Sequence, residues 1–289
     1  MNYYFIVNPV SGRGRGKVLG QRLAERLSRL SINFEMVWTE RPGHAIELAE
    51  RGARSHSVVV AVGGDGTMNE VLNGVVESGT ALGLIPVGSG NDFARAVNIP
   101  FDFDQALEVL LKGRKRKVDI GKANERYFHN GVGIGFDAWV VHTSLGVKRL
   151  RGNAIYLYSV LRTLMKYKPV PLELSFNGSV KIDDYFMISV GNGVSMGGGF
   201  YLTPDAEIDD SLFDLCLIQN MPTVSILRNL IKVYSGTHKE DPRVEMHRTD
   251  HLRVESRQPF GVHVDGELFS LSVQKLDIEI IPRGLEIIC

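Results

Sequence analysis

The chain has 289 residues, of which 44% are hydrophobic, and its 33 Lys and Arg residues balance 33 Asp and Glu residues. This length favours two domains over one, and the balanced charge excludes a global attraction to nucleic acid or to an anionic bilayer. The two cysteines give neither a disulfide framework nor a metal-binding spacing. No apolar run is long enough to span a membrane, and no signal peptide is evident. We therefore expect a cytoplasmic protein without a transmembrane segment.

Short apolar runs alternate with helical patterns in the first third of the chain. The runs at 3–7, 34–38, 58–62 and 81–87 are typical of strands. Between them lie leucines at helical spacing from Leu19 to Leu30, the helical segment AIELAERGA, and a segment with apolar residues on one helical face after Thr67. Continuous apolar runs separated by helices predict an α/β domain with a parallel, Rossmann-like sheet that is buried on both faces.

The pattern changes after the predicted helix DQALEVLLKG and the basic run that follows it. We place a domain boundary at residue 117. Residues 117–142, 170–218 and 250–281 are expected to form strands separated by turns, and residues 152–167 and 223–234 to form two helices. The sequence therefore predicts a second, largely antiparallel domain over residues 118–281.

The loop after the third predicted strand is the most informative segment. VVVAV ends in Gly63-Gly64-Asp65-Gly66-Thr67, and a helix follows at once. Backbone amides at a helix N-terminus, approached closely through glycines, form a site for phosphate. A carboxylate at Asp65 would repel phosphate unless a cation lay between them, which indicates Mg²⁺. In the alternative interpretation, Asp65 and Thr67 only cap the helix that starts at Met68.

Two further predicted strands end in similar loops, Asn8 to Gly12 and Gly88 to Asp92. Because the carboxyl ends of parallel strands lie on one edge of a sheet, the three loops should meet where open α/β folds bind ligands. The segment GRGRGKV does not fit a P-loop, and no G-x-G-x-x-G follows the first strand. These observations favour a nucleotide site of another type.

The loops and several later motifs resemble the diacylglycerol kinase catalytic family, which includes sphingosine and ceramide kinases and bacterial lipid kinases. The resemblance rests on N-P-x-S-G, G-G-D-G-T-x-N-E and G-S-G-N-D-F-A-R in this order, followed by residues 196–200, 204–206, 209–210 and 264–267. It covers nearly the whole chain. The length fits the stand-alone bacterial type.

This resemblance implies a nucleotide-binding α/β domain similar to NAD kinases and phosphofructokinases, a β-sandwich domain, and a return of residues 282–289 to the first domain. Catalysis would occur in a cleft between the domains. The residues implied in binding ATP are Asn8, Pro9, Val10, Ser11, Gly12, Thr39, Gly63, Gly64, Asp65, Gly66, Thr67, Met68, Asn69, Ser89, Gly266 and Glu267. Asp65, Asp92 and Asp119 lie where the family organises catalytic Mg²⁺.

Transfer of a phosphoryl group to a hydroxyl needs an acceptor for the hydroxyl proton, and a positioned carboxylate often fills this role. The resemblance implies that Asp265 is this acceptor. On the residues alone, Asp265-Gly266 within FGVHVDGELF is more typical of a tight hairpin turn, and the resemblance reverses this preference.

The family also binds a structural Mg²⁺ in the second domain. By resemblance, the Asp210 side chain and the backbone carbonyls of Glu207 and Leu212 would be its ligands, which suits a hard cation. The sequence departs from the family pattern at Glu207 and Ser211, where a basic residue and a glycine are commoner.

The resemblance implies an ATP-dependent lipid kinase that works at the membrane surface, with a tendency to form a homodimer. A kinase of a soluble substrate, similar to NAD kinases, and a nucleotide-sensing regulator remain as alternatives. Residues 142–168 combine aromatic residues with Lys148, Arg149, Arg151, Arg162, Lys166 and Lys168, which is typical either of an interfacial anchor or of an ordinary solvated helix. The sequence does not identify the lipid.

Overall fold

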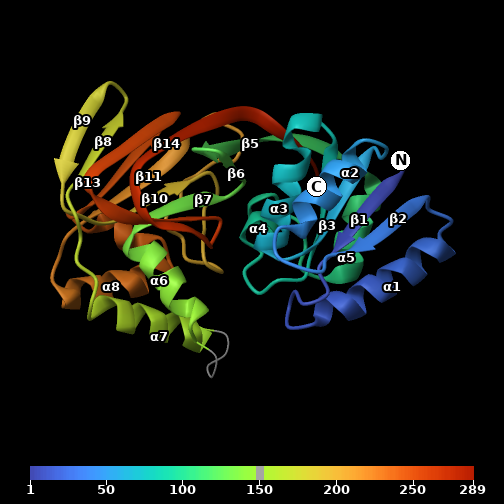
Figure 1. Cartoon of the computed structure of the whole chain (residues 1–289), viewed down its shortest axis with the longest axis horizontal. Coiled ribbons are helices and arrows are strands. Elements are labelled where there is room, and N and C mark those ends of the chain that lie inside the picture. Colours follow the sequence, from blue (N-terminus) through green and yellow to red (C-terminus); the bar gives the residue numbers. More distant parts are fainter. Residues whose placement is uncertain (148–152) are drawn as a thin grey trace. The chain divides into compact units, whose positions relative to one another are not determined.

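The computed structural model describes residues 1–147 and 153–289, so Lys148, Arg149 and Arg151 of the basic stretch lie outside the described residues (Figure 1). The described chain forms two compact units. The first consists of Met1–Ile120, Tyr127–His129 and Ile281–Cys289, and the second of Gly121–Arg126 and Asn130–Ile280. Two long strands, β5 (Lys115–Ala123) and β14 (Glu267–Ile288), contribute residues to both units.

The first unit is built on a parallel sheet in the order β2-β1-β3-β4. Its strands are β1 (Tyr3–Val7), β2 (Phe34–Trp38), β3 (Val58–Gly63) and β4 (Ala81–Pro86). Its helices are α1 (Arg15–Arg29), α2 (His44–Ala53), α3 (Asp65–Val75), α4 (Asp92–Ala96) and α5 (Phe103–Lys112), with a short 3₁₀ turn at Val76–Ser78. At the edge of the sheet, Ile287 of β14 pairs with Leu82 of β4 in parallel.

Helices cover both faces of this sheet (Figure 1). Gly52 of α2 lies against the ring of Tyr4, and Gly20 of α1 lies against the side chain of Val7. Because side chains alternate along a strand, Tyr4 and Val7 point to opposite faces. Burial on both faces explains why β1, β3 and β4 are apolar without alternation.

The second unit is built on an antiparallel sheet in the order β12-β11-β10-β7-β13-β14. Besides β14, its strands are β7 (Gly131–Gly135), β8 (Leu172–Phe176), β9 (Ser179–Asp183), β10 (Tyr185–Gly191), β11 (Phe213–Gln219), β12 (Val244–Thr249) and β13 (His251–Val264). Strand β6 (Arg126–Phe128) pairs with β5 and lies mostly in the first unit. The register of β13 against β14 shifts between Glu255 and Phe260, and β13 pairs with β8 before this shift and with β7 after it.

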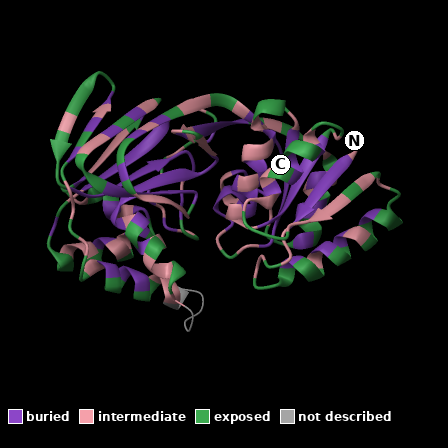
Figure 2. Ribbon diagram, viewed as in Figure 1, coloured by how far each residue is buried: buried purple, intermediate pink, exposed green. Residues whose placement is uncertain are grey.

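Three helices pack beside this sheet, α6 (Phe136–Leu145), α7 (Asn153–Leu164) and α8 (Thr223–Val233), and a 3₁₀ turn spans Thr237–Glu240. They share an apolar cluster with β10 and β11, which includes Phe136, Val160, Phe186 and Val233. Figure 2 shows the strands of the unit mostly buried and the outer sides of the helices exposed.

These elements confirm the predicted fold class, an α/β part followed by an antiparallel β part. One segment of the expectation is wrong, because residues 136–142 belong to helix α6 and not to a strand. The order of buried and exposed residues explains why the segment resembles a strand: Phe136, Ala138 and Val140 are buried, whereas Asp137 and Trp139 between them are more exposed. This alternation, with several β-branched and aromatic residues, imitates a strand, and the contacts of the folded unit override it.

In the described part of the chain, no helix combines the length and the apolar character needed to cross a membrane.

Candidate active site

The ends of the four parallel strands lie side by side in the first unit, as the sequence predicts. Beyond the ladder, the amide of Thr39 donates to Val7 O at 2.9 Å and the amide of Asn8 donates to Val62 O at 3.0 Å. The amide of Val87 donates to Gly63 O at 2.8 Å. The loops that follow β1, β2, β3 and β4 therefore start from one edge of the sheet.

Thr67 joins two of these loops through its side chain. Its Oγ1 accepts a hydrogen bond of 2.9 Å from Asn8 Nδ2 and lies 3.5 Å from the hydroxyl of Ser11. Asn8 Oδ1 in turn accepts from the amide of Val10 at 3.1 Å. The loop from Asn8 to Gly12 is thus fixed to the start of α3.

The loops approach one another so closely that two positions require glycine. A Cβ at Gly12, where φ is 56°, would lie 2.2 Å from the carbonyl oxygen of Val87. A Cβ at Gly88 would lie 2.7 Å from the Cα of Gly64. Since both obstacles are backbone atoms, a larger residue could fit only by separating the loops.

We expect Thr67→Val to loosen this arrangement. The change keeps the shape of the side chain but removes the acceptor of the Asn8 amide, so the free energy of unfolding should fall by about 1 to 2 kcal/mol. Denaturant titration measures this effect, and Thr80→Val, which removes a hydroxyl that donates to Ala53 O at 3.3 Å, is the matched control. Equal stability of Thr67→Val and the wild type would show that the Thr67 contacts do not hold the loops.

Asp65 points to the third loop and does not cap its own helix. Helix α3 begins after Gly64 without a side-chain cap. The Asp65 carboxylate instead accepts from the amide of Asn91 at 2.8 Å and from that of Phe93 at 3.4 Å. It therefore caps α4, and the interpretation of Asp65 as a cap of α3 does not hold.

The surroundings of Asp65 are unfavourable for its negative charge. Burial raises the pKa of Asp65, and the nearby Asp92 carboxylate raises it further, while the ring of His129 and the two amides lower it. Asp92 is itself buried and forms an ion pair of 2.7 Å with Arg95. Two carboxylates are thus held close together at the edge where the loops meet.

His129 belongs to this cluster, although no motif in the sequence indicates it. Its ring packs on Phe93 with the centroids 4.6 Å apart, and its Nε2 lies 3.4 Å from the backbone oxygen of Asp65. His129 follows β6, which is fixed to α3 because Asn69 and Asn73 both donate to Tyr127 O at 3.0 Å. Only the tertiary fold brings this histidine to Asp65.

The other candidate nucleotide residues occupy varied positions. Met68 is fully buried, and its amide donates to Gly64 O at 3.0 Å, whereas Val10 is 75% exposed and Ser89 is exposed. Pro9 and Gly66 are half-buried. Asp119 is fully buried in β5, and its Oδ1 accepts from the amide of Arg283 at 2.6 Å.

Asp265 occupies the hairpin turn between β13 and β14 in the second unit. Its φ is 48°, and Gly266 after it also has a positive φ. The side chain is almost buried, and its Oδ1 accepts from the amides of Asn130 at 3.0 Å and Gly131 at 2.9 Å. The segment is therefore a tight turn that also holds a carboxylate in a fixed orientation.

A histidine and a second carboxylate support this turn, and the sequence motifs assign neither of them a role. His263 Nδ1 accepts from the amide of Gly266 at 3.3 Å, and Nε2 lies 2.7 Å from Asp137 Oδ2. Because Nδ1 is an acceptor, the ring donates through Nε2 to Asp137. Glu267, next in the turn, pairs with Arg126.

Asp210, the candidate ligand of a structural cation, has protein partners for both oxygens. Its Oδ1 accepts from the amide of Leu212 at 3.0 Å, and its Oδ2 pairs with Arg248. Burial raises the pKa of Asp214 nearby to about 6, with further contributions from Asp205 and Glu207. Among residues 1–147 and 153–289, no three His, Cys, Asp or Glu side chains are grouped closely enough to hold a metal ion by themselves.

Comparisons with known proteins cover most of the chain. Residues 2–123 match the model of the diacylglycerol kinase catalytic domain, and residues 130–289 match that of the YegS C-terminal NAD kinase beta sandwich-like domain. A diacylglycerol kinase of Staphylococcus aureus (strain bovine RF122 / ET3-1) is 33% identical over 266 residues, which are 91% of this chain and 84% of that protein. The relative from strain MRSA252 has the same identity and coverage.

Solved structures show the same fold. A crystal structure of a diacylglycerol kinase from Bacillus anthracis str. Sterne superposes with a TM-score of 0.76 at 21% identity, covering 99% of this chain and 96% of that one. Another from the same organism, assigned provisionally as a diacylglycerol kinase, has a TM-score of 0.82 at 24% identity with the same coverage.

The match to the diacylglycerol kinase catalytic domain and the similarity to the diacylglycerol kinases of Staphylococcus aureus define a phosphotransferase of the lipid kinase class. The matched domain models and the curated relatives make the assignment more specific. The chain belongs to the diacylglycerol kinase catalytic-domain family.

Proposed function

We propose that the protein transfers the γ-phosphate of ATP to a hydroxyl of a membrane lipid, diacylglycerol or a lipid of similar form. The observation that carries this proposal is the joining of the strand-end loops at Thr67, with the Asp65 carboxylate turned to the third loop. Open α/β folds bind ligands at this edge of the sheet, and glycines without a Cβ let phosphate approach the backbone. Membership of a lipid kinase family supports the acceptor.

In this proposal, ATP binds at the loops from Asn8 to Gly12 and from Gly63 to Asn69, with contacts from Thr39 and Ser89. Gly266 and Glu267, which follow Asp265, belong to the proposed set through family resemblance. The side chains of Asn8 and Thr67 hold one another at 2.9 Å and would present the loops in a fixed form.

Asp65 and Asp92 fit a Mg²⁺ ion. The repulsion between the two carboxylates, and the raised pKa of Asp65, would be relieved by a divalent cation. Mg²⁺ is commonly bound by one or two carboxylates together with phosphate oxygens and water, so a complete protein cage is not needed. When bound, the ion would neutralise charge on the phosphates of ATP. Asp119 belongs to the proposed set through family resemblance.

Asp265 would accept the proton of the lipid hydroxyl. Its Oδ1 is already held by two backbone amides, which fixes the orientation of the carboxylate. A positioned carboxylate of this kind can serve as general base. His263 and Asp137 would keep the turn in place through the amide of Gly266.

A structural Mg²⁺ at Asp210, with the carbonyls of Glu207 and Leu212, is also part of the proposal. The negative surroundings of Asp214 favour a cation there, but Arg248 already pairs with Asp210 and would have to move. Where Mg²⁺ is present at ten times its dissociation constant, binding should add about 1.4 kcal/mol to the free energy of unfolding. Thermal unfolding with and without Mg²⁺ measures this gain, which Asp210→Asn should lose. A wild type that is indifferent to Mg²⁺ would contradict the site.

The proposed enzyme is cytoplasmic, works at the membrane surface where its substrate lies, and forms a homodimer. Sedimentation analysis of the purified chain tests the homodimer, and a monomer at all concentrations would contradict it.

The substrate class is tested with labelled ATP and a panel of acceptors. The panel contains diacylglycerol, a sphingoid base, ceramide, phosphatidylglycerol and an undecaprenyl-type alcohol in mixed micelles, with NAD as the soluble alternative. We expect phosphate in one lipid and none in NAD. Transfer to NAD alone would replace the proposal with a soluble-substrate kinase.

A further inference from the structure

A series of contacts leads from helix α6 to the turn that carries Asp265. Asp137 lies in the first turn of α6, and its Oδ2 is 2.7 Å from His263 Nε2. His263 Nδ1, on the other side of the ring, accepts from the amide of Gly266 at 3.3 Å. These contacts therefore end at the backbone next to the proposed base.

The Gly266 amide uses this partner because of the conformation of the turn. Asp265 and Gly266 both have positive φ, 48° and 78°, which is typical of a type I′ hairpin turn. The strands on either side pair Val264 with Glu267, so the amide of Gly266, at the tip, lies outside the ladder of β13 and β14. The ring of His263 supplies the acceptor that the ladder does not.

The histidine and the aspartate have little room to move. The side chain of His263 is 2% exposed and that of Asp137 is 13% exposed. A Cβ at Gly133, which pairs with His263 in the sheet, would lie 2.1 Å from His263 Nε2 and 2.8 Å from Asp137 Oδ2. Gly131 of the same strand β7 donates to Asp265 Oδ1. Strand β7 thus contacts both the proposed base and the pair of side chains behind the turn.

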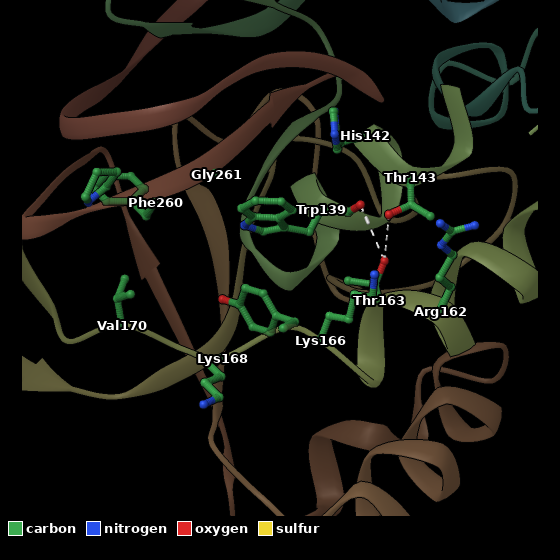
Figure 3. Close-up of a pocket in the computed structure, with 12 residues that line it drawn as sticks. Trp139, His142, Thr143, Arg162, Thr163, Lys166, Lys168, Val170, Phe260 and Gly261 are labelled. Carbon is green, nitrogen blue, oxygen red and sulfur yellow. Dashed lines mark hydrogen bonds between the residues drawn. The ribbon is translucent and has the colours of Figure 1, made fainter. Parts of the chain in front are cut away.

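Helix α6, which carries Asp137, is itself fixed by α7. In Figure 3, Trp139 and Thr143 of α6 lie beside Thr163 of α7, at a pocket of about 380 Å³ in the second unit. The two threonine hydroxyls are 3.0 Å apart, and Thr163 Oγ1 lies 3.5 Å from the backbone oxygen of Trp139. These contacts hold the start of the series in place.

The carboxylate of Asp137 selects the form of the histidine ring. A neutral imidazole carries its proton on one nitrogen, and only the form protonated on Nε2 lets Nδ1 accept from Gly266. Because a carboxylate only accepts hydrogen bonds, Asp137 favours the proton on Nε2 of His263. The first turn of a helix stabilises a negative charge, which favours the ionised form of Asp137.

We propose that His263 and Asp137 are positioning residues for the proton acceptor. Asp137 selects the ring form, the ring fixes the Gly266 amide, and the turn then holds the Asp265 carboxylate in its working orientation. The inference rests on the proposed function of Asp265 as general base. Because neither side chain needs to touch a substrate, their loss should lower kcat and leave the KM values for ATP and for the lipid almost unchanged.

Two substitutions of His263 separate its two contacts. Asparagine places an acceptor near the position of Nδ1 but is too short to reach Asp137, whereas glutamine places a donor near Nε2 and no acceptor at Nδ1. We expect His263→Gln to lower kcat by about 10- to 100-fold, because misplacing a catalytic group by about 1 Å can cost about 10²-fold. His263→Asn should stay within about 3-fold of the wild type. Turnover is measured with ATP and the lipid that the acceptor panel identifies.

Stability should rank the same two variants in the opposite order. His263→Asn leaves the mostly buried Asp137 carboxylate without its donor, whereas water can replace the lost partner of the exposed Gly266 in His263→Gln. We therefore expect the melting temperature to fall more in His263→Asn, although this variant keeps more turnover. A loss of turnover that follows the loss of stability in both variants would mean a purely structural role.

The matched control is His251→Gln. His251, at the start of the same strand β13, also pairs with an aspartate, Asp277, so the substitution disturbs a similar pair in the same unit. Its turnover should equal that of the wild type. A loss equal to that of His263→Gln would mean that any such pair in the unit has this effect.

A double variant tests whether His263 acts through the base. His263→Gln/Asp265→Asn should be no more than about 2-fold slower than Asp265→Asn alone, because a support has little effect once the group that it positions has lost its function. Losses that multiply in the double variant would show that His263 acts independently of Asp265.

NMR of the imidazole nitrogens observes the ring form without turnover. The signals of His263, assigned by their loss in His263→Asn, should show the proton on Nε2 in the wild type. In Asp137→Ala, the form protonated on Nδ1 should appear, and kcat should fall by about 3- to 10-fold. A wild-type ring protonated on Nδ1 would contradict the proposal.

The remaining outcomes separate this inference from the proposed function. Wild-type turnover of His263→Gln beside an inactive Asp265→Asn would refute the inference alone. A raised KM with normal kcat in Asp137→Ala or His263→Gln would assign the pair to substrate binding and would also overturn it. Wild-type turnover of Asp265→Asn would instead refute the proposed base.

Discussion

Asp265→Asn should reduce lipid phosphorylation by about 10² to 10⁴-fold while ATP still binds, because a general base contributes a factor of this size. The fold should be unaffected. Asn is tolerated at positive φ, and its Oδ1 can still accept from the amides of Asn130 and Gly131. Steady-state turnover, equilibrium binding of ATP and the melting temperature measure the three expectations.

Asp250→Asn is the matched control for this change, because Asp250 lies in the turn between β12 and β13 of the same unit. It should keep wild-type turnover. If Asp265→Asn also kept it, Asp265 would not be the proton acceptor, and its hydrogen bonds would only shape the turn.

Asp65→Asn is the second substitution with a large expected effect. It should lower turnover by about 10²-fold or more, as expected when several kcal/mol of charge stabilisation by a metal ion is lost. Stability should change little, because the change removes the repulsion from Asp92 and the cost of burying a charge but also removes one amide hydrogen bond: Asp65 Oδ1 and Oδ2 each accept one, and asparagine has a single acceptor oxygen. A large loss of turnover at nearly unchanged stability would be typical of a site where charge is held for function.

The control for Asp65→Asn is Asp104→Asn, which breaks an exposed ion pair with Arg22 in the same unit. Turnover and denaturant unfolding are measured for both variants over a range of Mg²⁺ concentrations. Near-normal turnover of Asp65→Asn at every Mg²⁺ concentration would show that Asp65 does not bind the catalytic Mg²⁺.

The α/β unit could be predicted from the sequence because its strands are buried on both faces. Such strands are continuous apolar runs, and helices of regular spacing separate them. Since parallel strands end at one edge of their sheet, the sequence also predicts that Asn8, Gly63 and Gly88 lie close together. The structure confirms that the ends of β1 and β3 lie close together, because Thr67, just after β3, contacts Asn8 and Ser11, just after β1.

Other features depend on contacts between residues far apart in the chain. The partners of the Asp65 carboxylate are amides 26 and 28 residues later, and His129 reaches Asp65 only because β6 is fixed to α3. The pairing of Asp210 with Arg248 joins β12 to the loop before β11. No local pattern encodes such contacts.

Helix α6 shows the opposite problem, a local pattern that misleads. Its alternation of buried and exposed residues is that of a strand, and it forms a helix because Phe136 and Val140 join the apolar cluster of the second unit. The same helix supplies Trp139 and His142 to the lining of a pocket in the second unit.

The most direct test of the central claim compares ATP labelled at the γ-phosphate with ATP labelled at the α-phosphate. The wild type is incubated with each in the presence of Mg²⁺ and diacylglycerol micelles, and the label in the extracted lipid is counted. Transfer of the γ-phosphate to a lipid hydroxyl predicts label in the lipid from γ-labelled ATP only. Label from α-labelled ATP, or no label in any lipid of the panel from γ-labelled ATP, would contradict the proposed reaction.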